Sequence, residues 1–428
     1  MAVAGSLTDR GQAIVRELMA QPYPRHPDPL FHELRAVSPV FESDQGVWVL
    51  TSYDACALAF RSPAFGQGEA AKLVKLDPRF EWSAVLQSLG QMMVFMDPPD
   101  HTRLRRIVAR AFNPAVIAGL RPYVQQVVDD LLEPFTESEE VDLVTDFTDL
   151  IPVTVICELL GVPHADHEQC RHWSEEIALA IEPDVDDDAM RRADVATLAY
   201  RDYFTALVAE KRAHPQDDLL TLLVKAEDDG DTLSTDELVA MATLILGAGF
   251  ETTRNGIAGG VLALHAHPGE LDRLRRDPAL DRSAVDEILR FVSPNQTSVA
   301  RFALEDVEVG GATIPKGAVV APCIAAGNRD PERFADPDRL ALDRPDNIPL
   351  TFAPGPHLCL GAPVARLEIE VAIGTLARRF PRLLVLDDDP PMRPTCSLGP
   401  GPRGPLHLPA VVGMRRTHRT HGGFNRGR

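Results

Sequence analysis

The sequence predicts a mainly α protein with small β-sheets. Helical spacing of apolar residues extends through most of residues 116–226 and again over 233–267 and 363–380. The runs rich in β-branched and aromatic residues are short, at 40–51 and 298–324, and Gly-containing turns interrupt them. Long helical patterns and short strands together favour this class over an all-β or a regularly alternating α/β chain.

Composition excludes several function classes. The chain has 428 residues, so length alone suggests two or three domains. Its formal net charge of −20 argues against a nucleic-acid partner. Six cysteines without a CxxC pair are consistent with a reducing compartment, so we expect a cytoplasmic protein. No stretch reaches about 18 uninterrupted apolar residues, so we expect no membrane span.

The first elements in chain order are a hairpin and a long irregular segment. Val40 to Thr51 contains two β-like runs around a Gly-containing turn, which predicts the hairpin. Residues 61–96 are irregular, and a long loop in a compact domain is often functional. Its apolar members, among them Met92, Val94 and Phe95, suit a ligand pocket or an ordinary core equally well.

A helical run at 100–112 has two cationic faces. At about 100° per residue, His101 and Arg105 share one face with apolar residues, and the opposite face carries Arg103, Arg106 and Arg110. A buried cation needs an anionic partner, so the first pair is a candidate anion site. A solvated helix face explains the other three arginines.

The longest helical pattern, at 233–267, contains an acid beside an alcohol. Two glycines flank Ala248 in mid-helix, and each costs about 1 kcal/mol relative to alanine. Thr252 can donate to the carbonyl of Ala248 and bend the helix beside Glu251. This indicates a local groove next to Glu251 and Thr252. Close packing of two helices is the alternative explanation of the glycines.

A proline- and glycine-rich loop at 352–361 holds a single cysteine just before the last long helical pattern. Proline fixes φ and glycine permits unusual φ, so the loop has a specific shape. Cys359 therefore lies near a helix N-terminus, which favours an anionic sulfur. A rigid loop that offers one thiolate suits a haem iron. The alternative is a buried structural cysteine.

These motifs together resemble the cytochrome P450 family. Phe352, Gly355, His357, Cys359 and Gly361 are similar to the family's cysteine-ligand signature, although Ala353 stands where the family usually has glycine. The run from 248 to 253 resembles its oxygen-activating motif. Between them, in family order, lies a Glu-x-x-Arg motif at 287–290. The resemblance extends from about residue 22 to 409.

The resemblance implies one domain with the cytochrome P450 fold at 22–410, which overrides the length-based expectation. We expect a mobile N-terminal segment at 1–21 and a basic, disordered tail at 411–428. The implied cofactor is haem b, with dioxygen as co-substrate. Cys359 is the implied iron ligand. The implied haem contacts, including those to the propionates, are His101, Arg105, Ala248, Arg301, Phe352, Gly355, His357 and Gly361.

The remaining roles follow from the same resemblance. Glu251 and Thr252 are implied to relay protons to dioxygen. Glu287 and Arg290 pair structurally, and we expect Arg339 to complete the group that supports the cysteine loop. The candidate substrate-pocket residues lie on three loops and the long helix: Met92, Val94, Phe95, Leu244, Ile245, Asn295, Gln296 and Leu398.

The implied function is monooxygenation, most simply hydroxylation, of an apolar small molecule in natural-product, steroid or terpenoid metabolism. No flavin or nicotinamide motif is visible, so we expect electrons from a separate ferredoxin and ferredoxin reductase, and a monomeric enzyme. Two alternatives stay open. One is a haem-thiolate enzyme for oxidative coupling or peroxide-driven oxidation, and the other is a non-catalytic haem protein.

Overall fold

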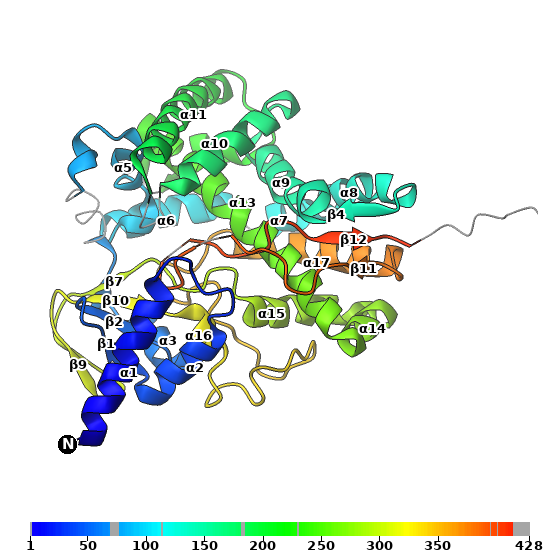
Figure 1. The fold of residues 1–428 in the computed structure, drawn as a ribbon. Helices are drawn as coiled ribbons and strands as arrows, with labels where there is room; N and C mark the ends of the chain where they lie inside the picture. The colour runs from blue at the N-terminus through cyan, green and yellow to red at the C-terminus, as the bar shows by residue number, and fades with distance from the viewer. Residues whose placement is uncertain are drawn as a thin grey trace, which may run out of the picture.

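The structure, a computed structural model, has a large helical part and a smaller part built on β-strands (Figure 1). It describes residues 2–68, 77–112, 114–180, 185–228, 231–393, 395–399 and 401–413. The predicted class, mainly α with small sheets, is confirmed. Most of the predicted basic tail, from residue 414 onward, lies outside the described residues.

The helices account for most of the described chain. They are α1 Ala2–Met19, α2 Asp28–Val37, α3 Tyr53–Arg61, α5 Ala84–Leu89, α6 Asp100–Ala111, α7 Pro114–Gly119, α8 Arg121–Leu132, α9 Leu150–Leu160, α10 His167–Leu179, α11 Asp187–Ala213, α12 Leu219–Lys225, α13 Thr235–Ala266, α14 Pro268–Arg276, α15 Asp281–Val292, α16 Ile324–Asn328 and α17 Ala362–Arg379. None of the described helices is long and apolar enough to cross a membrane.

The strands are short and form small sheets. They are β1 Val40–Glu42, β2 Val47–Leu50, β3 Phe65–Gly66, β4 Glu140–Asp142, β5 Glu227–Asp228, β6 Asp231–Thr232, β7 Arg301–Ala303, β8 Val307–Val309, β9 Ala312–Ile314, β10 Val319–Pro322, β11 Leu384–Val385 and β12 Pro409–Val411. The largest sheet has the order β1-β2-β10-β7-β3, with β2 and β10 parallel. The predicted hairpin is its β1–β2 edge.

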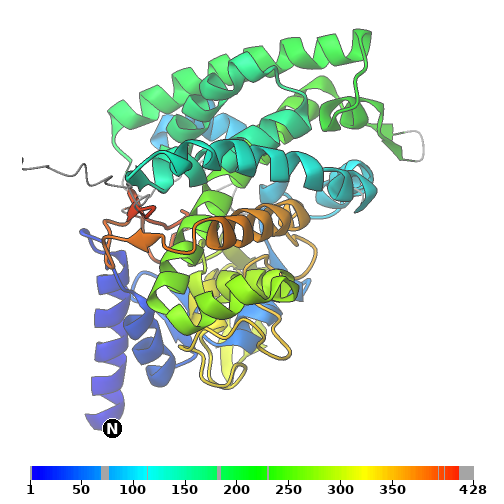
Figure 2. The same ribbon diagram turned by 90° about the vertical axis from the view of Figure 1, so that its right-hand side faces the viewer.

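Helix α13 runs through the middle of the helical part (Figures 1 and 2). Its capping box is formed as the sequence predicts, because Ser234 caps the Glu237 amide and the Glu237 carboxylate accepts from the Ser234 amide. Its first half packs in one hydrophobic cluster with α5, α6 and α9–α12, and its second half packs in another with α8, α14, α15 and α17. Residues 251–256 therefore lie where two cores meet.

The N-terminal segment, for which the sequence predicts mobility, contains a helix that packs against its neighbour. Residues 2–19 form α1, which stands beside α2 at one side of the molecule (Figure 2). Ile14, Val15 and Leu18 are buried against Phe31 and Leu34 of α2. Burial of several large apolar side chains provides enough free energy to fix a short helix.

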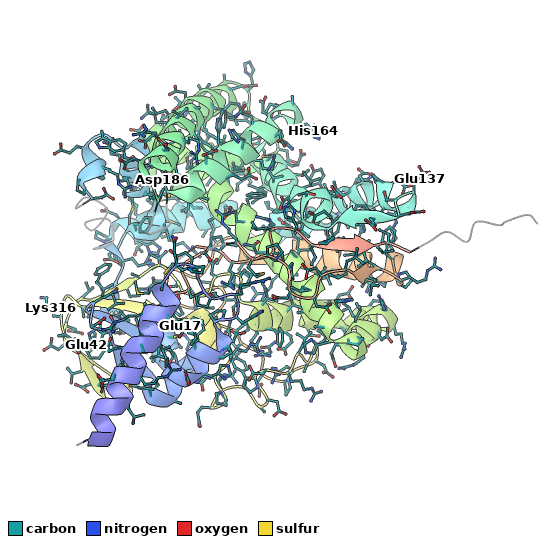
Figure 3. The ribbon with its side chains drawn as sticks, viewed as in Figure 1. Glu17, Glu42, Glu137, His164, Asp186 and Lys316 are labelled. Atoms are coloured by element: carbon teal, nitrogen blue, oxygen red, sulfur yellow. The ribbon has the colours of Figure 1, made fainter. Side chains whose placement is uncertain are left out.

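Charged side chains are exposed on many elements, although several charged residues described below are buried. Glu17, Glu42, Glu137 and Asp186, labelled in Figure 3, are exposed and lie on segments far apart in the chain. His164, also labelled there, is exposed, whereas His167 beside it is buried and its Nε2 lies 3.2 Å from the carbonyl of Val162. No group of three His, Cys, Asp or Glu residues that could hold a metal occurs among the described residues.

Candidate active site around Cys359

The cysteine loop places Cys359 at an exposed position. The Cys359 amide donates to the carbonyl of Phe352 at 3.0 Å, which closes the loop on itself. Of the six cysteines, all within the described residues, Cys359 is exposed and the other five are buried. Protein around the sulfur raises the pKa of the thiol by burial, and the amides of Gly361 and Ala362 and the charge of Arg105 oppose that shift.

Two positions of this loop require left-handed backbone. Gly355 has φ +130°, and a side chain there would collide with the backbone of Phe60 in α3. Ala353 has φ +49°, where an L-residue with a Cβ is strained by about 1–2 kcal/mol. The loop therefore keeps the conformation that glycine would adopt freely, even though this chain has alanine at 353.

Four cationic or hydrogen-bonding side chains gather beside the loop. His101 is buried with its ring 4.0 Å from that of His357, and Arg105 donates to the carbonyl of Leu358 at 2.6 Å. Arg301, on β7, is 3% exposed. Burial lowers the pKa of His357 to about 3 and that of Arg301 to about 10.

This cluster carries more positive charge than its surroundings balance. The charge of Asp97 raises the pKa of His101 and of Arg301, but burial lowers both pKa values by more. The buried Nε2 of His101 has no hydrogen-bond partner among the described residues. Buried cations and an orphaned ring nitrogen fit carboxylates of a bound group, so the residues present fit the propionates of haem b.

Gln67 is a member of the cluster that the sequence reasoning missed. It is 2% exposed. With its amide oriented so that oxygen faces donors, it accepts from Arg301 and its nitrogen lies 2.7 Å from Nδ1 of His357. Asp97 fixes this turn, because its carboxylate accepts from the amides of Gln67 and Gly68, both at 2.8 Å. Only the flanking glycines at 66 and 68 signalled a tight turn in the sequence.

The glycines of α13 have different explanations. A Cβ at Gly249 would collide with Ile156 of α9, so this glycine serves close helix packing, which was the alternative explanation. A Cβ at Gly247 meets nothing within 4 Å, and Ala248 is exposed in mid-helix. Thr252 donates to the carbonyl of Ala248 at 2.8 Å, as the sequence predicts. The helix thus presents a face of small residues at this point.

Glu251 lies on the buried side of the same turn. Its carboxylate forms an ion pair with Arg393, from the segment after α17, and the two side chains are 4% and 15% exposed. Burial raises the pKa of Glu251, and the charges of Arg393 and Arg254 lower it. The acid and the alcohol are therefore neighbours on the helix but face different surroundings.

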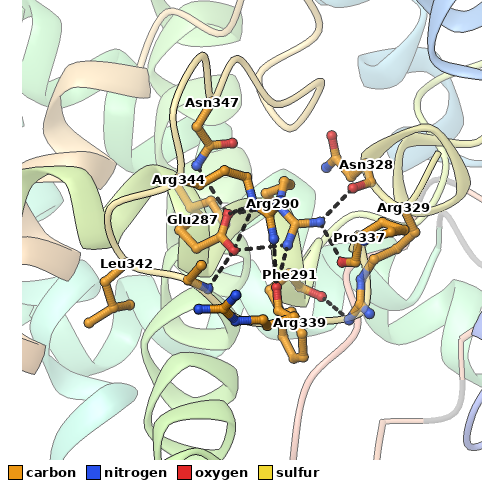
Figure 4. Close-up of polar contacts among 12 residues, drawn as sticks. Glu287, Arg290, Phe291, Asn328, Arg329, Pro337, Arg339, Leu342, Arg344 and Asn347 are labelled. Atoms are coloured by element: carbon orange, nitrogen blue, oxygen red, sulfur yellow. Dashed lines mark hydrogen bonds and ion pairs between the residues drawn. The ribbon is translucent and has the colours of Figure 1, made fainter. Parts of the chain in front are cut away.

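The Glu-x-x-Arg motif forms the predicted pair, and the pair is buried. Arg290 donates from Nε to Glu287 at 2.7 Å and from Nη2 at 2.9 Å, and both side chains are completely buried (Figure 4). Arg290 also donates to the carbonyls of Asn328 and Pro337, each at 2.8 Å. The pair thereby joins α15 to the long segment that leads to the cysteine loop.

The expectation that Arg339 completes this pair is wrong. The third arginine is Arg344, whose Nε lies 3.1 Å from both carboxylate oxygens of Glu287. Arg339 is exposed and contributes its backbone carbonyl, which accepts from Arg290 and Arg344 (Figure 4). Arg344 follows the turn that begins at Ala341, and this turn directs its side chain inward.

The candidate pocket residues fall into two groups. Met92, Val94 and Phe95 join the hydrophobic cluster that also includes Leu244 and Ile245 of α13. The second group, Asn295, Gln296 and Leu398, lies at two segments joined by the Thr297 hydroxyl, which donates to the carbonyl of Ser397 at 2.9 Å. In this group, Leu398 packs against the cluster of the N-terminal helices.

Helix α6 carries an arginine stripe, which consists of Arg103, Arg106 and Arg110, and acidic side chains neutralise part of it. Arg103 pairs with Asp231 at 3.2 Å and with Glu237, the capping residue of α13. Arg106 and Arg110 are exposed. The predicted separation into two faces is otherwise confirmed, because His101 is buried and lies beside Arg105 near the cysteine loop.

Comparison with known proteins agrees with this site. The cytochrome P450 family model matches residues 74–403. The vitamin D(3) 25-hydroxylase of Pseudonocardia autotrophica is 41% identical over 371 residues, covering 86% of this chain and 89% of the relative. The 6-deoxyerythronolide B hydroxylase of Saccharopolyspora erythraea is 37% identical over 385 residues, covering 88% and 93%.

Solved structures show the same fold. P450BioI, in complex with an acyl carrier protein ligated to hexadec-9Z-enoic acid, is similar with a TM-score of 0.83 at 32% identity, covering 90% of this chain and 98% of that one. CYP109E1 from Bacillus megaterium, in complex with testosterone, gives a TM-score of 0.79 at 28% identity, covering 91% and 100%.

The chain belongs to the cytochrome P450 family. It is a haem-thiolate monooxygenase, an oxidoreductase whose cofactor is haem b and whose co-substrate is dioxygen. Its relatives place it with the bacterial-type enzymes of natural-product metabolism, which act on apolar substrates and take electrons from ferredoxin and ferredoxin reductase.

Proposed function

We propose that this enzyme hydroxylates an apolar polycyclic substrate of the steroid or terpenoid kind, with vitamin D(3) the first compound to test. Four half-buried apolar side chains that pack against one hydrophobic cluster support an apolar substrate: Val94, Phe95, Leu244 and Ile245. The relative named a vitamin D(3) 25-hydroxylase and the testosterone complex of a similar structure support the polycyclic class.

The observation that carries the residue roles is the single exposed cysteine in the strained loop. Cys359 would hold the iron as its thiolate, with the amides of Gly361 and Ala362 stabilising the sulfur charge. His101, Arg105, Arg301 and His357 would hold the propionates: the two arginines by charge, which would keep those carboxylates ionised, and the two imidazoles by hydrogen bonds. Phe352, Gly355 and Gly361 shape the loop, and the small, exposed side chain of Ala248 would leave room for the haem.

The chain's own contribution to the reaction is proton delivery and water exclusion. The haem, when bound, supplies the redox chemistry, and thiolate donation promotes cleavage of the O–O bond. Glu251 would take up protons from the surroundings of its buried face. The Thr252 hydroxyl, held by its bond to Ala248, would pass them to the reacting oxygen.

Thr252→Ala tests this assignment. It should keep the substrate-induced spin-state shift, still consume reductant, and form less product and more hydrogen peroxide per electron pair. Thr243→Ala is the matched control, because Thr243 makes the same backward bond, to Val239 at 2.8 Å, two turns earlier on α13. If Thr252→Ala formed product and peroxide in the wild-type ratio, the role of Thr252 would be helix packing alone.

We propose that the ferredoxin docks on the exposed part of the arginine stripe of α6. Ferredoxins are acidic, so Arg106 and Arg110 offer complementary charge. Reversing both to Glu should slow reduction by the ferredoxin most at low salt, since charges on exposed surfaces are screened at high salt. An equal rate at low salt would exclude this docking site. We further propose a cytoplasmic location, which the six free cysteines support. We also propose that the enzyme is a monomer.

A further inference from the structure

Gln67 lies where three parts of the chain meet. Its buried side chain follows strand β3, which pairs with β7, the strand that begins at Arg301. With its amide oxygen directed to donors, Gln67 accepts from Arg301. Its amide nitrogen then lies 3.0 Å from the carbonyl of Val94 and beside the ring of His357. This side chain therefore joins the sheet, the cysteine loop and the segment at 92–96, which contains candidate pocket residues.

The chemistry of the amide fixes the role of each neighbour. A backbone carbonyl can only accept and a guanidinium can only donate, so Val94 takes one N–H of Gln67 and Arg301 donates to its oxygen. The second N–H faces the imidazole of His357, with the nitrogen 2.7 Å from Nδ1 and 2.9 Å from Nε2. Gln67 is thus the donor in this contact, and the ring nitrogen that accepts from it carries no hydrogen.

The contact selects one tautomer of His357. A neutral imidazole carries its single hydrogen on one of its two nitrogens, so the nitrogen that does not accept from the amide is the N–H of the ring. That N–H is a donor in a cluster that fits carboxylates of a bound group. The amide of Gln67 therefore leaves His357 with a donor for a haem propionate.

The backbone around Gln67 is held by Asp97. The amides of Gln67 and Gly68 both donate to the Asp97 carboxylate at 2.8 Å. A Cβ at Gly66 or at Gly68 would lie 2.6 or 2.8 Å from an oxygen of this carboxylate, so the two glycines permit its close approach. The turn and the segment before α6 are thus joined twice, through Asp97 and through the carbonyl of Val94.

We propose that Gln67 is a positioning residue that sets the tautomer of His357 and couples the segment at 92–96 to the haem carboxylates. It acts through its hydrogen bonds and takes no part in the redox chemistry. The inference rests on the proposed contact between His357 and a propionate. Loss of the Gln67 amide should loosen the haem and the segment at 92–96 together.

The tautomer of His357 tests the proposal without turnover. In the reduced carbon monoxide complex, which is diamagnetic, nitrogen-15 shifts distinguish the two neutral tautomers of a histidine, and His357→Gln assigns the signal by its loss. The wild type should show one tautomer. Gln67→Glu keeps the shape, accepts from Arg301 and cannot donate, so the ring nitrogen that faces it should gain the hydrogen. Gln67→Met should leave a mixture, and one unchanged tautomer in all three proteins would overturn the proposal.

Hydrogen exchange of the segment at 92–96 tests the coupling. In the wild type, the last two amides of this segment donate to carbonyls three residues earlier. Gln67→Glu and Gln67→Met both remove the donor to Val94, so these amides should exchange faster, on the order of fivefold, in either variant. Exchange at the wild-type rate in both variants would refute the coupling.

Gln125→Glu is the matched control. Gln125 is a half-buried glutamine of α8 that donates to Asp129 and Thr375, each at 3.2 Å, instead of to the cluster around His357. It should keep the wild-type tautomer, exchange and rate of haem transfer to apomyoglobin, whereas both Gln67 variants should transfer haem faster. Equal changes in the control would overturn the proposal. Haem transfer at the wild-type rate in His357→Gln would refute the propionate contact, while the tautomer still decides the role of Gln67.

Discussion

Two buried glutamates of this enzyme, Glu287 on α15 and Glu251 on α13, each pair with arginine, yet their surroundings differ. Glu287 accepts from Arg290, Arg344, the Asn347 amide and the backbone amide of Ala341 (Figure 4). Glu251 contacts Arg393, and no other hydrogen-bond donor to its carboxylate is found among the described residues. The first carboxylate is satisfied from all sides, whereas the second depends on one contact.

The difference separates a structural acid from one that can exchange a proton. A carboxylate that accepts several charge-assisted bonds is strongly held in its ionised form, and losing any partner leaves a buried charge uncompensated. A carboxylate with one partner can be released by moving that partner alone. The distinction lies in the number and origin of the donors, because both acids are almost completely buried.

The largest expected effect is at Glu287. Glu287→Gln removes the negative charge that two buried arginines require, and breaking a buried pair costs about 3–5 kcal/mol. We expect most of the protein to be recovered without haem or in aggregates, measured as haem content per purified chain. Glu251→Gln should retain haem and lose turnover. If both variants loaded haem equally, the contrast between the two acids would fail.

A third buried glutamate, Glu368 on α17, sharpens the contrast because its Oε2 has no partner in the described part of the chain. Burial raises its pKa to about 8. The folded state then holds a proton that the unfolded state releases near the ordinary value of 4.5, so stability falls as pH rises between these values, by about 1.4 kcal/mol per unit.

Glu368→Gln should abolish this slope. Denaturant unfolding of the wild type and the variant at about pH 5, 6.5 and 8, in even steps through this pH range, provides the comparison. The two should be close in stability at the acid end, and the variant should be the more stable at the alkaline end. If the stability of the two proteins changed with pH in parallel, Glu368 would be ionised in the folded state or would contribute nothing to the pH dependence of stability.

The next largest effect on stability is expected at Arg344, the third arginine of the Glu287 network. Arg344→Met removes charge-assisted bonds to Glu287 and should cost about 1.5–3 kcal/mol. Arg339→Met is the matched control, because only the backbone carbonyl of Arg339 serves the network, so its cost should stay within about 0.5 kcal/mol. Chemical denaturation of both variants measures the difference. A larger loss in Arg339→Met would reinstate the assignment made from sequence.

The smallest effect concerns the cysteine loop. Ala353 occupies left-handed backbone, and Ala353→Gly removes the Cβ strain, so it should stabilise the loop by about 1 kcal/mol. Part of that gain is offset by the greater freedom of glycine in the unfolded chain. The melting temperature of the haem-loaded enzyme measures it. A decrease of several degrees would indicate that the Ala353 side chain makes favourable contacts.

Features that depend on residues close together in the chain could be predicted from the sequence. Contacts between residues far apart in the chain could not. The capping box of α13, the Thr252 bond to Ala248 and the cysteine loop depend on residues a few positions apart. Arg344 and Arg393 approach glutamates 57 and 142 residues away, and no local pattern fixes such contacts. The spacing of Ile14, Val15 and Leu18 was a local signal for a packed helix, and it was overlooked.

Substitution of Cys359 tests the central claim most directly. The red-shifted Soret band of the reduced carbon monoxide complex reports a thiolate ligand on the haem iron. We predict that Cys359→Ser abolishes this band, while Cys323→Ser and Cys396→Ser, which change buried cysteines, keep it. A Cys359→Ser enzyme that retained the band would contradict the assignment of the ligand and the site built around it.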